Sequence, residues 1–585
     1  MLRSSRAIAS LIRSLTLGTA STVALATLAT SVAGCKDESQ PEYWVDKLDD
    51  PAWRPRAVKR LEQFYEDAIT KANKDQQNPE VQALLNKIVE PLTKAYVEHY
   101  GDLDTKTRVS LIKLLASFED KRIEPAIKKA LEEFAKRPAS SKDDADVKWA
   151  AHAAGDLKMD SLNGPLLQAF LKLKASTMLG GISYRDFNES LVAIHDKAWT
   201  QPLITALSAE IVRPESAKDK DKIDPYRDQL FWQTTAAQVL GEIQAPEAVE
   251  PLLRVMLDPG KGDVQATAVL ALVKIGKPAV ERTVKVLDGS DEKLVAFHLR
   301  RIKEVNKLKE APKDHPEVAT AALVLGTIGR AEALAPMLEA LKKADKDANK
   351  AVIAREITKL PATAESKEAF KSAFESISLD TVIPPGAAAL PSLAEFAGQF
   401  YDPTMVDWLL ERAEKTKGSG EDLKALQTSI TVTAIKLAKP DQLDKVKAAV
   451  DKYGTKLEKD LYEQADKLVK ACGDRIPCYL AEMEKSANQD QKNQFIAIKA
   501  GYMVGILGNE SSVGELVERM SSFENAAVRF VAAQTIDHLL PKGSKDVADK
   551  LKKIIDKNAE SGDKDKIAGD APLKQVMYRI ETRAS

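Results

Sequence analysis

Side chains that could carry catalysis or bind a metal are few and scattered in this sequence. No two of its six histidines lie within five residues of each other. They are His99, His152, His195, His298, His315 and His538. A Gly-x-Ser-x-Gly nucleophile turn, a phosphate-binding loop and a His-Glu-x-x-His metal pair are all missing from the sequence. We therefore expect no metal, no cofactor, no small-molecule substrate and no enzymatic activity. An enzyme with an unrecognised site between repeats stays an open alternative.

The N-terminus has the residue types of an export signal. Arg3, Arg6 and Arg13 precede an uncharged stretch that ends Val32-Ala33-Gly34-Cys35. This ending resembles the lipobox of bacterial lipoproteins. The resemblance implies that a peptidase cuts before Cys35, whose thiol then carries diacylglycerol. Residues 1–34 would be the lipoprotein signal peptide and Cys35 the lipidation site. An uncleaved transmembrane helix is the alternative, although eight Ser and Thr residues weaken that segment as a span.

The lipoprotein resemblance also predicts a location. Residues 35–41 would be a short lipid-anchored tether, and the lipidated Cys35 would be the only attachment to the membrane. Lys36, in place of an aspartate, points by resemblance to enterobacterial sorting toward the outer membrane. We therefore expect a protein of the bacterial cell envelope that faces the periplasm.

Cys472 and Cys478 are the two thiols that remain once Cys35 carries lipid. Gly473 and Pro477 between them favour a turn that could bring the two Cα atoms within reach of a disulfide. An oxidising compartment would favour that bond. We predict a structural disulfide that clamps one turn, with two free thiols as the alternative. The spacing fits neither a redox Cys-x-x-Cys pair nor a complete metal site.

The rest of the sequence predicts an all-α protein. After residue 42, apolar residues recur at helical spacing and are interrupted by Pro, Gly or charged clusters. A short sequence motif built around one Pro recurs along the chain, and we call each copy a phrase. Proline fits the first turn of a helix without cost, because the N–H that it lacks would have no partner there. Its prolines are Pro91, Pro125, Pro165, Pro202, Pro251 and Pro336. Each phrase therefore predicts the start of the second helix of a stacked helix pair.

The centre of the chain resembles a known repeat family. Residues 236–249, 271–280 and 322–329 are similar to HEAT repeats of the short, bilin-lyase type, with the best matches across residues 229–341. Gly276 and Gly329 stand where the family has a glycine between helices. The resemblance implies an α-α superhelix, a HEAT-like solenoid of about 12 helix pairs, in which neighbouring pairs share one core. It carries no lyase activity across. We expect divergent helical repeats at 42–228, HEAT-like central repeats at 229–375 and divergent repeats at 376–585. The charged, Pro-bearing stretch Arg213–Asp228 would be the loop between the first two arrays.

Composition limits the function further. The 585-residue chain carries 86 Lys and Arg against 87 Asp and Glu, a net charge of −1, with 44% hydrophobic residues. It is too apolar for a disordered chain and too charged for a polytopic membrane protein. The balance also argues against a nucleic-acid partner, which would require a basic excess. The leading interpretation is a lipid-anchored scaffold that binds a protein or peptide on its concave face. A purely structural spacer is a further alternative.

Charged pairs on the second helices are the candidate binding residues. Glu250 with Arg254, and Glu281 with Lys285, have the i, i+4 spacing that favours an ion pair on a helix. HEAT-like arrays line their concave face with second helices, so by resemblance these pairs would form a charge ladder there. We predict that the four residues contact a partner. The alternative is that they only keep the surface soluble.

Overall fold

A computed structural model of the chain describes residues 37–137, 145–174, 184–216, 218–489 and 493–584. The expected signal peptide and Cys35 lie outside these residues. The chain divides into two compact units, Met1–Ala95 and Tyr96–Ser585. Within the described ranges, no helix is both long enough and apolar enough to span a lipid bilayer.

The first unit contains α1 (Pro41–Val45), α2 (Arg54–Lys71) and most of α3 (Pro79–Glu98). The apolar residues of α2, among them Ala57, Val58 and Leu61, recur at helical spacing and are buried. Trp44 of α1 is also fully buried, and its indole N–H donates a hydrogen bond to the carbonyl of Glu38 at 2.8 Å. The unit is therefore held by one apolar core with its polar indole group satisfied.

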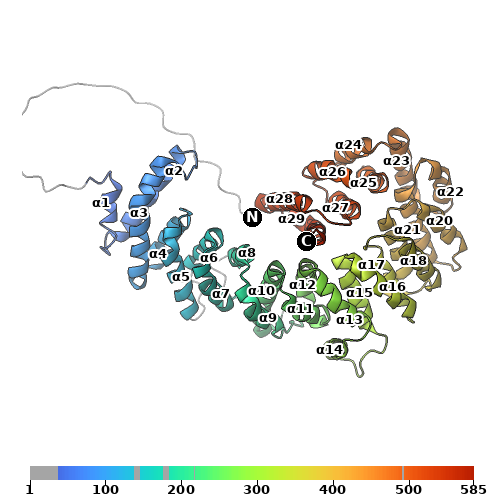
Figure 1. Cartoon of the computed structure of the whole chain (residues 1–585), viewed down its shortest axis with the longest axis horizontal. Coiled ribbons are helices and arrows are strands. Elements are labelled where there is room, and N and C mark those ends of the chain that lie inside the picture. Colours follow the sequence, from blue (N-terminus) through green and yellow to red (C-terminus); the bar gives the residue numbers. More distant parts are fainter. Residues whose placement is uncertain (1–36, 138–144, 175–183, 217, 490–492, 585) are drawn as a thin grey trace, which may run out of the picture. The chain divides into compact units, whose positions relative to one another are not determined.

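The second unit consists of helices that alternate between two layers along the chain (Figure 1). In the first layer, each helix packs on the next helix of the same layer. These helices are α4 (Thr105–Ala116), α6 (Ala145–Leu157), α8 (Tyr184–Ile194), α10 (Lys220–Ile243), α12 (Gly262–Ile275), α15 (Pro316–Ile328), α17 (Asp347–Ile357), α19 (Ala389–Phe396), α21 (Glu421–Leu437), α23 (Lys456–Cys472), α25 (Gln494–Leu507) and α27 (Ala526–Leu539).

The second layer covers one side of the first. Its helices are α5 (Glu124–Lys136), α7 (Asp160–Lys172), α9 (Thr200–Ser208), α11 (Val249–Met256), α13 (Lys277–Leu287), α16 (Leu334–Lys343), α18 (Ala364–Ser376), α20 (Thr404–Lys415), α22 (Leu443–Tyr453), α24 (Ile476–Ala487), α26 (Val513–Met520) and α28 (Lys545–Ser561). The unit is an all-α superhelix, which confirms the predicted fold class.

Sequence explains why the layers differ. First-layer helices such as α12 and α25 are apolar around most of their circumference because they are covered on several sides. Second-layer helices such as α11 and α26 have one apolar stripe and one polar face. Gly241 of α10 lies so close to α12 that a Cβ atom there would stand 2.8 Å from the Cα of Ala271. A small residue therefore sets the separation of these two helices.

A few elements stand outside the two layers. Helix α14 (Glu292–Val305) is inserted between α13 and α15, and α29 (Lys564–Gly569) and α30 (Ala571–Arg583) end the chain. Two short antiparallel strands, β1 (Val382–Ile383) and β2 (Ala387–Ala388), pair Val382 with Ala388 and Ile383 with Ala387. They form a small turn between α18 and α19 and leave the all-α architecture unchanged.

The recurring prolines mark helix starts in four of the six phrases. Pro125, Pro202, Pro251 and Pro336 lie in the first turn of α5, α9, α11 and α16. Pro91 and Pro165 instead lie inside α3 and α7, so the prediction of a helix start is wrong at these two positions. Both helices begin earlier, at Pro79 and Asp160, and continue past a residue that cannot donate a backbone hydrogen bond.

The segment 213–228 also differs from its predicted form. We expected a loop there that separates two arrays, with a boundary between residues 228 and 229. Helix α10 instead begins at Lys220, contains Pro225 and runs without a break to Ile243. The charged, proline-bearing sequence is typical of a loop, but packing of α10 against α9 and α12 extends the helix through it.

The C-terminal helix returns to the middle of the second unit. Helix α30 contacts α12 as well as α27 and α28, which precede it along the chain. Figure 1 shows the C-terminus beside α12, on the inner side of the curve formed by α12 to α28. Leu573, Val576 and Ile580 of α30 are buried. The first-layer helices from α12 to α27 and the returning α30 therefore form a closed ring of contacts.

Candidate functional site

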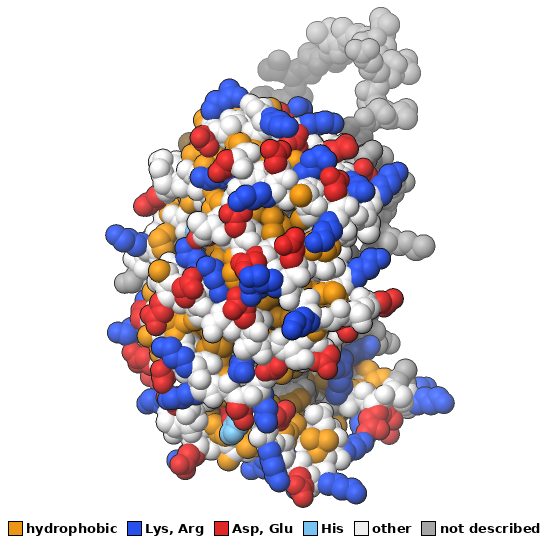
Figure 2. Space-filling view, turned by 90° about the vertical axis from the view of Figure 1, so that its right-hand side faces the viewer, with side chains coloured by type: hydrophobic (Ala, Val, Ile, Leu, Met, Phe, Trp, Pro, Cys, Tyr) orange, Lys and Arg blue, Asp and Glu red, His pale blue; other side chains and the backbone are white. Residues whose placement is uncertain are grey.

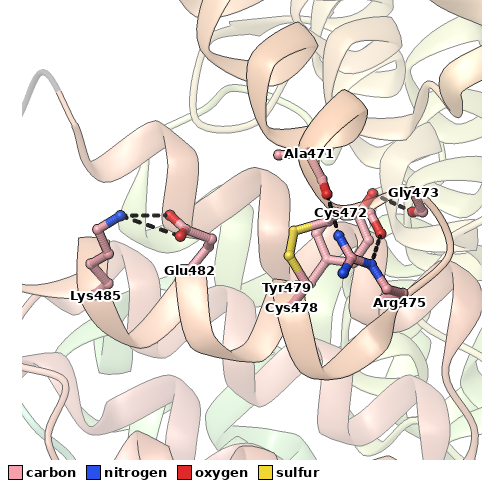
Figure 3. The surroundings of a disulfide bond; sticks show 8 residues. All are labelled: Ala471, Cys472, Gly473, Arg475, Cys478, Tyr479, Glu482 and Lys485. Atoms are coloured by element: carbon pink, nitrogen blue, oxygen red, sulfur yellow. Dashed lines mark hydrogen bonds and ion pairs between the residues drawn. A yellow bond between two sulfur atoms is a disulfide. The ribbon is translucent and has the colours of Figure 1, made fainter.

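The structure brings the predicted cysteine pair together (Figure 3). Cys472 ends α23 and Cys478 lies in the first turn of α24, with their sulfurs 2.00 Å apart and their Cα atoms 5.4 Å apart. Arg475 donates hydrogen bonds to the carbonyls of Cys472 and Ala471, at 3.1 and 2.5 Å. These bonds cap the end of α23, so the turn has support apart from the two sulfurs. A disulfide in the native protein stays a prediction.

Of the predicted charge ladder, one pair forms as expected. On α11, the guanidinium of Arg254 lies 2.9 Å from the carboxylate of Glu250. On α13, Glu281 pairs with Lys277 at 3.9 Å, so its partner lies four residues before it. Lys285 is exposed. The expected Glu281–Lys285 pair is therefore replaced by a pair with the opposite direction along the helix.

Sequence reasoning missed the residue that links the two helices. Arg282 of α13 reaches Glu250 of α11 at 3.1 Å and Asp291 at 2.8 Å. In the repeat alignment, Arg282 occupies the position that Pro251 has in the preceding repeat. That substitution was the available signal, because an arginine in the second turn of α13 can reach the helix before it.

An aromatic residue from the inserted helix completes this surface. The guanidinium carbons of Arg254 and Arg300 lie 4.8 and 5.7 Å from the ring centroid of Phe297 on α14, within the range of cation–π attraction. Phe297 is half-buried. We call the surface formed by Glu250, Arg254, Arg282, Lys285 and Phe297 the α11–α14 face.

The predicted placement of these residues on the concave side is wrong. In the second unit, α11 and α13 belong to the layer on the outer side of the curve, whereas α12 and α15 lie on the inner side (Figure 1). Helix α30 packs on the inner layer, at α12. The prediction failed because it assumed the usual orientation of second helices, which the periodicity of the sequence does not determine.

Polar contacts hold α30 against the inner layer. Arg583 donates to the carbonyl of Gly329 at 2.5 Å, and Arg330 donates to the carbonyl of Thr582 at 2.6 Å. Arg579 donates to the carbonyl of Lys359. These carbonyls lie at or just beyond the C-terminal ends of helices, where backbone acceptors lack partners within the helix. The contacts therefore both cap helices and fix the ring.

A cavity of about 380 Å³ lies beside α30, and we call it the ring-closure cavity. Its wall comes from the end of α15, the residues after α17, the end of α19 and the residues after it, α27, and α30. Polar side chains that line it include Lys359, Gln534, Asp537, Arg579 and Arg583. All of them lie in the second unit, and sequence reasoning predicted none of them.

Burial alters the titration of several groups around this cavity. Burial lowers the pKa of the Arg579 guanidinium to about 10, although Asp537 opposes this shift. Burial also lowers the pKa of His538, so this imidazole favours its neutral form. His538 stacks on Tyr401, with ring centroids 4.4 Å apart. Perturbed groups beside a cavity are a common property of binding sites.

Metal binding has no support among the side chains that the structure describes. Within these ranges, no three His, Cys, Asp or Glu residues are grouped so that they could hold an ion.

Comparisons with known proteins identify one segment. Residues 232–258, from α10 to the turn after α11, match the family of the PBS lyase HEAT-like repeat. No curated protein matches the chain. Similar solved structures include an engineered protein, with 14% identity over 85% of this chain and 98% of that chain and a TM-score of 0.22. Importin beta has 10% identity over 92% and 84% of the two chains, with a TM-score of 0.25. SYS-1 has 12% identity over 92% and 98%, with a TM-score of 0.22.

The family match includes the second half of α10, all of α11 and the turn between them, which are neighbouring elements of the two layers. It also contains Glu250 and Arg254 of the α11–α14 face. The centre of the chain is therefore similar to the PBS lyase HEAT-like repeat, within an all-α superhelix.

Proposed function

We propose that this chain is a protein-binding scaffold of the bacterial cell envelope, anchored by a lipid on Cys35. The observation that carries the proposal is the two-layer array of helices, with its HEAT-like repeat at 232–258. Stacked repeats offer a long surface built from many helices, and such surfaces suit extended protein or peptide partners. Fold alone does not determine function, so the binding surface has to be argued from its side chains.

The α11–α14 face is the binding surface that we favour. Arg254, Arg282 and the half-buried Phe297 meet there, and arginine and aromatic side chains are enriched at interface hot spots. Figure 2 shows basic and acidic side chains interspersed over the face that it presents. Such a solvated face would contribute less binding free energy than a surface where an aromatic ring and several guanidinium groups converge.

Charge reversal on this face tests the proposal. The double variant Arg254→Glu and Lys285→Glu should reduce partner capture from an envelope extract by about tenfold or more, because like charges would oppose the partner. Stability should change by about 1 kcal/mol or less, since exposed ion pairs contribute little. Capture is measured by quantitative mass spectrometry with the soluble mature chain as bait.

A matched control is available on α26. Arg519 pairs with Glu515 at 2.7 Å on its own helix and also contacts Glu484 of α24. It thus combines a pair within one helix and a pair between two second-layer helices, like those on α11 and α13. The variant Arg519→Glu should leave capture unchanged. Equal capture by the α11–α14 variant and this control would show that the face does not bind the partner. Absence of any stoichiometric partner would favour the spacer, and turnover of a substrate would favour an enzyme.

Lipid attachment is tested separately. Cys35→Ala should abolish labelling of the protein by a fatty-acid analogue and release it from the membrane fraction. Labelling that persists in this variant would refute the anchor and leave the scaffold proposal untouched.

A further inference from the structure

The ring-closure cavity contains one carboxylate shared by two arginines. The carboxylate of Asp537 lies 3.0 Å from the guanidinium of Arg579 and 2.9 Å from that of Arg583. The two arginine side chains are only 5% and 6% exposed, so water screens them little. One positive charge in this buried cluster therefore has no carboxylate of its own.

A second cluster nearby repeats the imbalance. The carboxylate of the fully buried Glu356 forms ion pairs with the guanidinium of Arg355 at 2.9 Å and the Nζ of Lys359 at 2.5 Å. Lys359 lines the cavity and its backbone carbonyl accepts from Arg579, so the two clusters touch. Four cations thus surround two carboxylates on this side of the ring. Buried charge of one sign is costly unless an opposite charge compensates it.

Hydrogen bonding is incomplete as well. The Nε–H of Arg579 is buried and has no acceptor among the described residues. Asp537 and the carbonyl of Lys359 already occupy other nitrogens of this guanidinium. An acceptor that enters the cavity could therefore satisfy a buried donor that the protein leaves unused.

Sequence and packing both preserve this arrangement. Gly329 has a φ of +69°, and a Cβ atom there would stand 1.8 Å from the guanidinium of Arg579. Only glycine leaves room for this arginine beside the inter-helix turn. The site is therefore built by the close approach of α30 to the turn after α15.

The remaining wall of the cavity combines apolar side chains with polar ones, among them Gln399, Gln575 and His538. Leu360, Phe396, Phe530 and Val576 contribute to it, and Gln534 adds an amide. A volume of about 380 Å³ is in the range of small-molecule pockets. An occupant would thus present a negative group to the arginines and an apolar body to these four apolar side chains.

We propose that the ring-closure cavity binds a small organic carboxylate with an apolar body, held by Arg579 and Arg583. The unused Nε–H of Arg579 offers one charge-assisted hydrogen bond to a carboxylate oxygen, and a monoanion would offset one of the uncompensated charges. This site is separate from the α11–α14 face and does not depend on the scaffold proposal.

Binding is tested with 4-fluorobenzoate as the probe, followed by ¹⁹F NMR on the full mature chain. We expect saturable line broadening that benzoate reverses and that benzamide, its uncharged analogue, does not. Ionic strength is held constant with sodium chloride. Displacement by inorganic phosphate without displacement by benzoate would overturn the carboxylate assignment, and absence of saturable binding would overturn the site.

Two variants assign the binding to this cavity. Arg583→Gln should lower the affinity for the probe about tenfold or more, because it removes one of the two positive charges beside Asp537. Gln534→Phe fills part of the cavity from a half-buried position without changing any charge, and it should also weaken binding. Arg519→Gln, on α26 at a position that does not line the cavity, serves as the control. Unchanged affinity in Gln534→Phe, with its fold verified by circular dichroism, would refute the location.

Discussion

At the scale of single residues, two buried lysines act as helix caps. The Nζ of Lys499 donates to the carbonyls of Lys436 and Ala438, at 3.0 and 2.6 Å, beyond the end of α21. Lys261 does the same for Leu207 and Ala209 after α9. Each lysine satisfies carbonyls that the preceding helix leaves without partners. These contacts join first-layer helices to neighbouring loops and help to fix the array.

We predict that Lys499→Met destabilises the second unit by about 1–3 kcal/mol, because two carbonyls lose their donor. Burial lowers the pKa of Lys499 to about 7 from an ordinary value of 10.5. Between these values the unfolded chain binds more protons, so this lysine makes stability rise with pH, by at most about 1.4 kcal/mol per unit. The advantage of the native protein over the variant should therefore grow from pH 7 to pH 9.

Urea unfolding at pH 7, 8 and 9 measures this difference. Lys485→Met, at an exposed position on α24, is the control and should have little effect at any of these values. A difference between native protein and Lys499→Met that stays constant over this range would contradict the titration of Lys499.

Gly329 shows how far a single residue could be predicted from the sequence. The repeat pattern correctly indicated a turn glycine there, and its φ of +69° agrees with that role. Its contact with Arg579 could not be predicted, because the two residues are far apart in the chain and no local pattern links them. Periodicity predicts contacts between neighbouring helices of a repeat, but it does not predict contacts between distant segments such as those that close the ring.

At the scale of elements, the α23–α24 turn carries a testable bond. Non-reducing peptide mapping of the purified native protein should find Cys472 joined to Cys478. Cys478→Ser should lower stability by at most about 2–3 kcal/mol, because the closed loop is short. The hydrogen bonds of Arg475 and of the Tyr479 hydroxyl to backbone carbonyls should preserve the turn in the variant. Free thiol at both positions would contradict the prediction.

The helices themselves could be predicted better than their ends. The recurring motif and apolar periodicity correctly indicated several second-layer helices, such as α11 and α16, since each has one apolar stripe. It failed for α10, where the charged residues of 220–228 are typical of a loop but form the first turns of a long helix. Packing on neighbouring helices decided that boundary, and a single sequence does not contain this information.

At the scale of the whole second unit, α30 determines whether the ring is closed. Ile580 is fully buried and Val576 is nearly so. Replacing both with Glu should release α30, because two buried carboxylates would have no partners. Hydrogen exchange should then rise at residues 327–331, whose carbonyls and side chains hold α30. Ile567→Glu, at an exposed position on α29, should leave exchange unchanged.

Unchanged protection of residues 327–331 in the Val576→Glu and Ile580→Glu variant would contradict the closed ring. The same variant should also fail to bind the carboxylate probe, since Arg579 and Arg583 would leave the cavity with α30. Partner capture by the α11–α14 face should persist, because that face lies on the other layer.

Site-specific cross-linking tests the scaffold proposal most directly. A photo-reactive phenylalanine analogue at position 297, in the full chain within living cells, should give one dominant cross-linked protein. The same analogue at Trp408, also an aromatic and half-buried residue but on α20, should give little of it. The proposal predicts that Arg254→Glu with Lys285→Glu abolishes the cross-link from position 297. A cross-link of equal strength from position 408, or none from position 297, would contradict it.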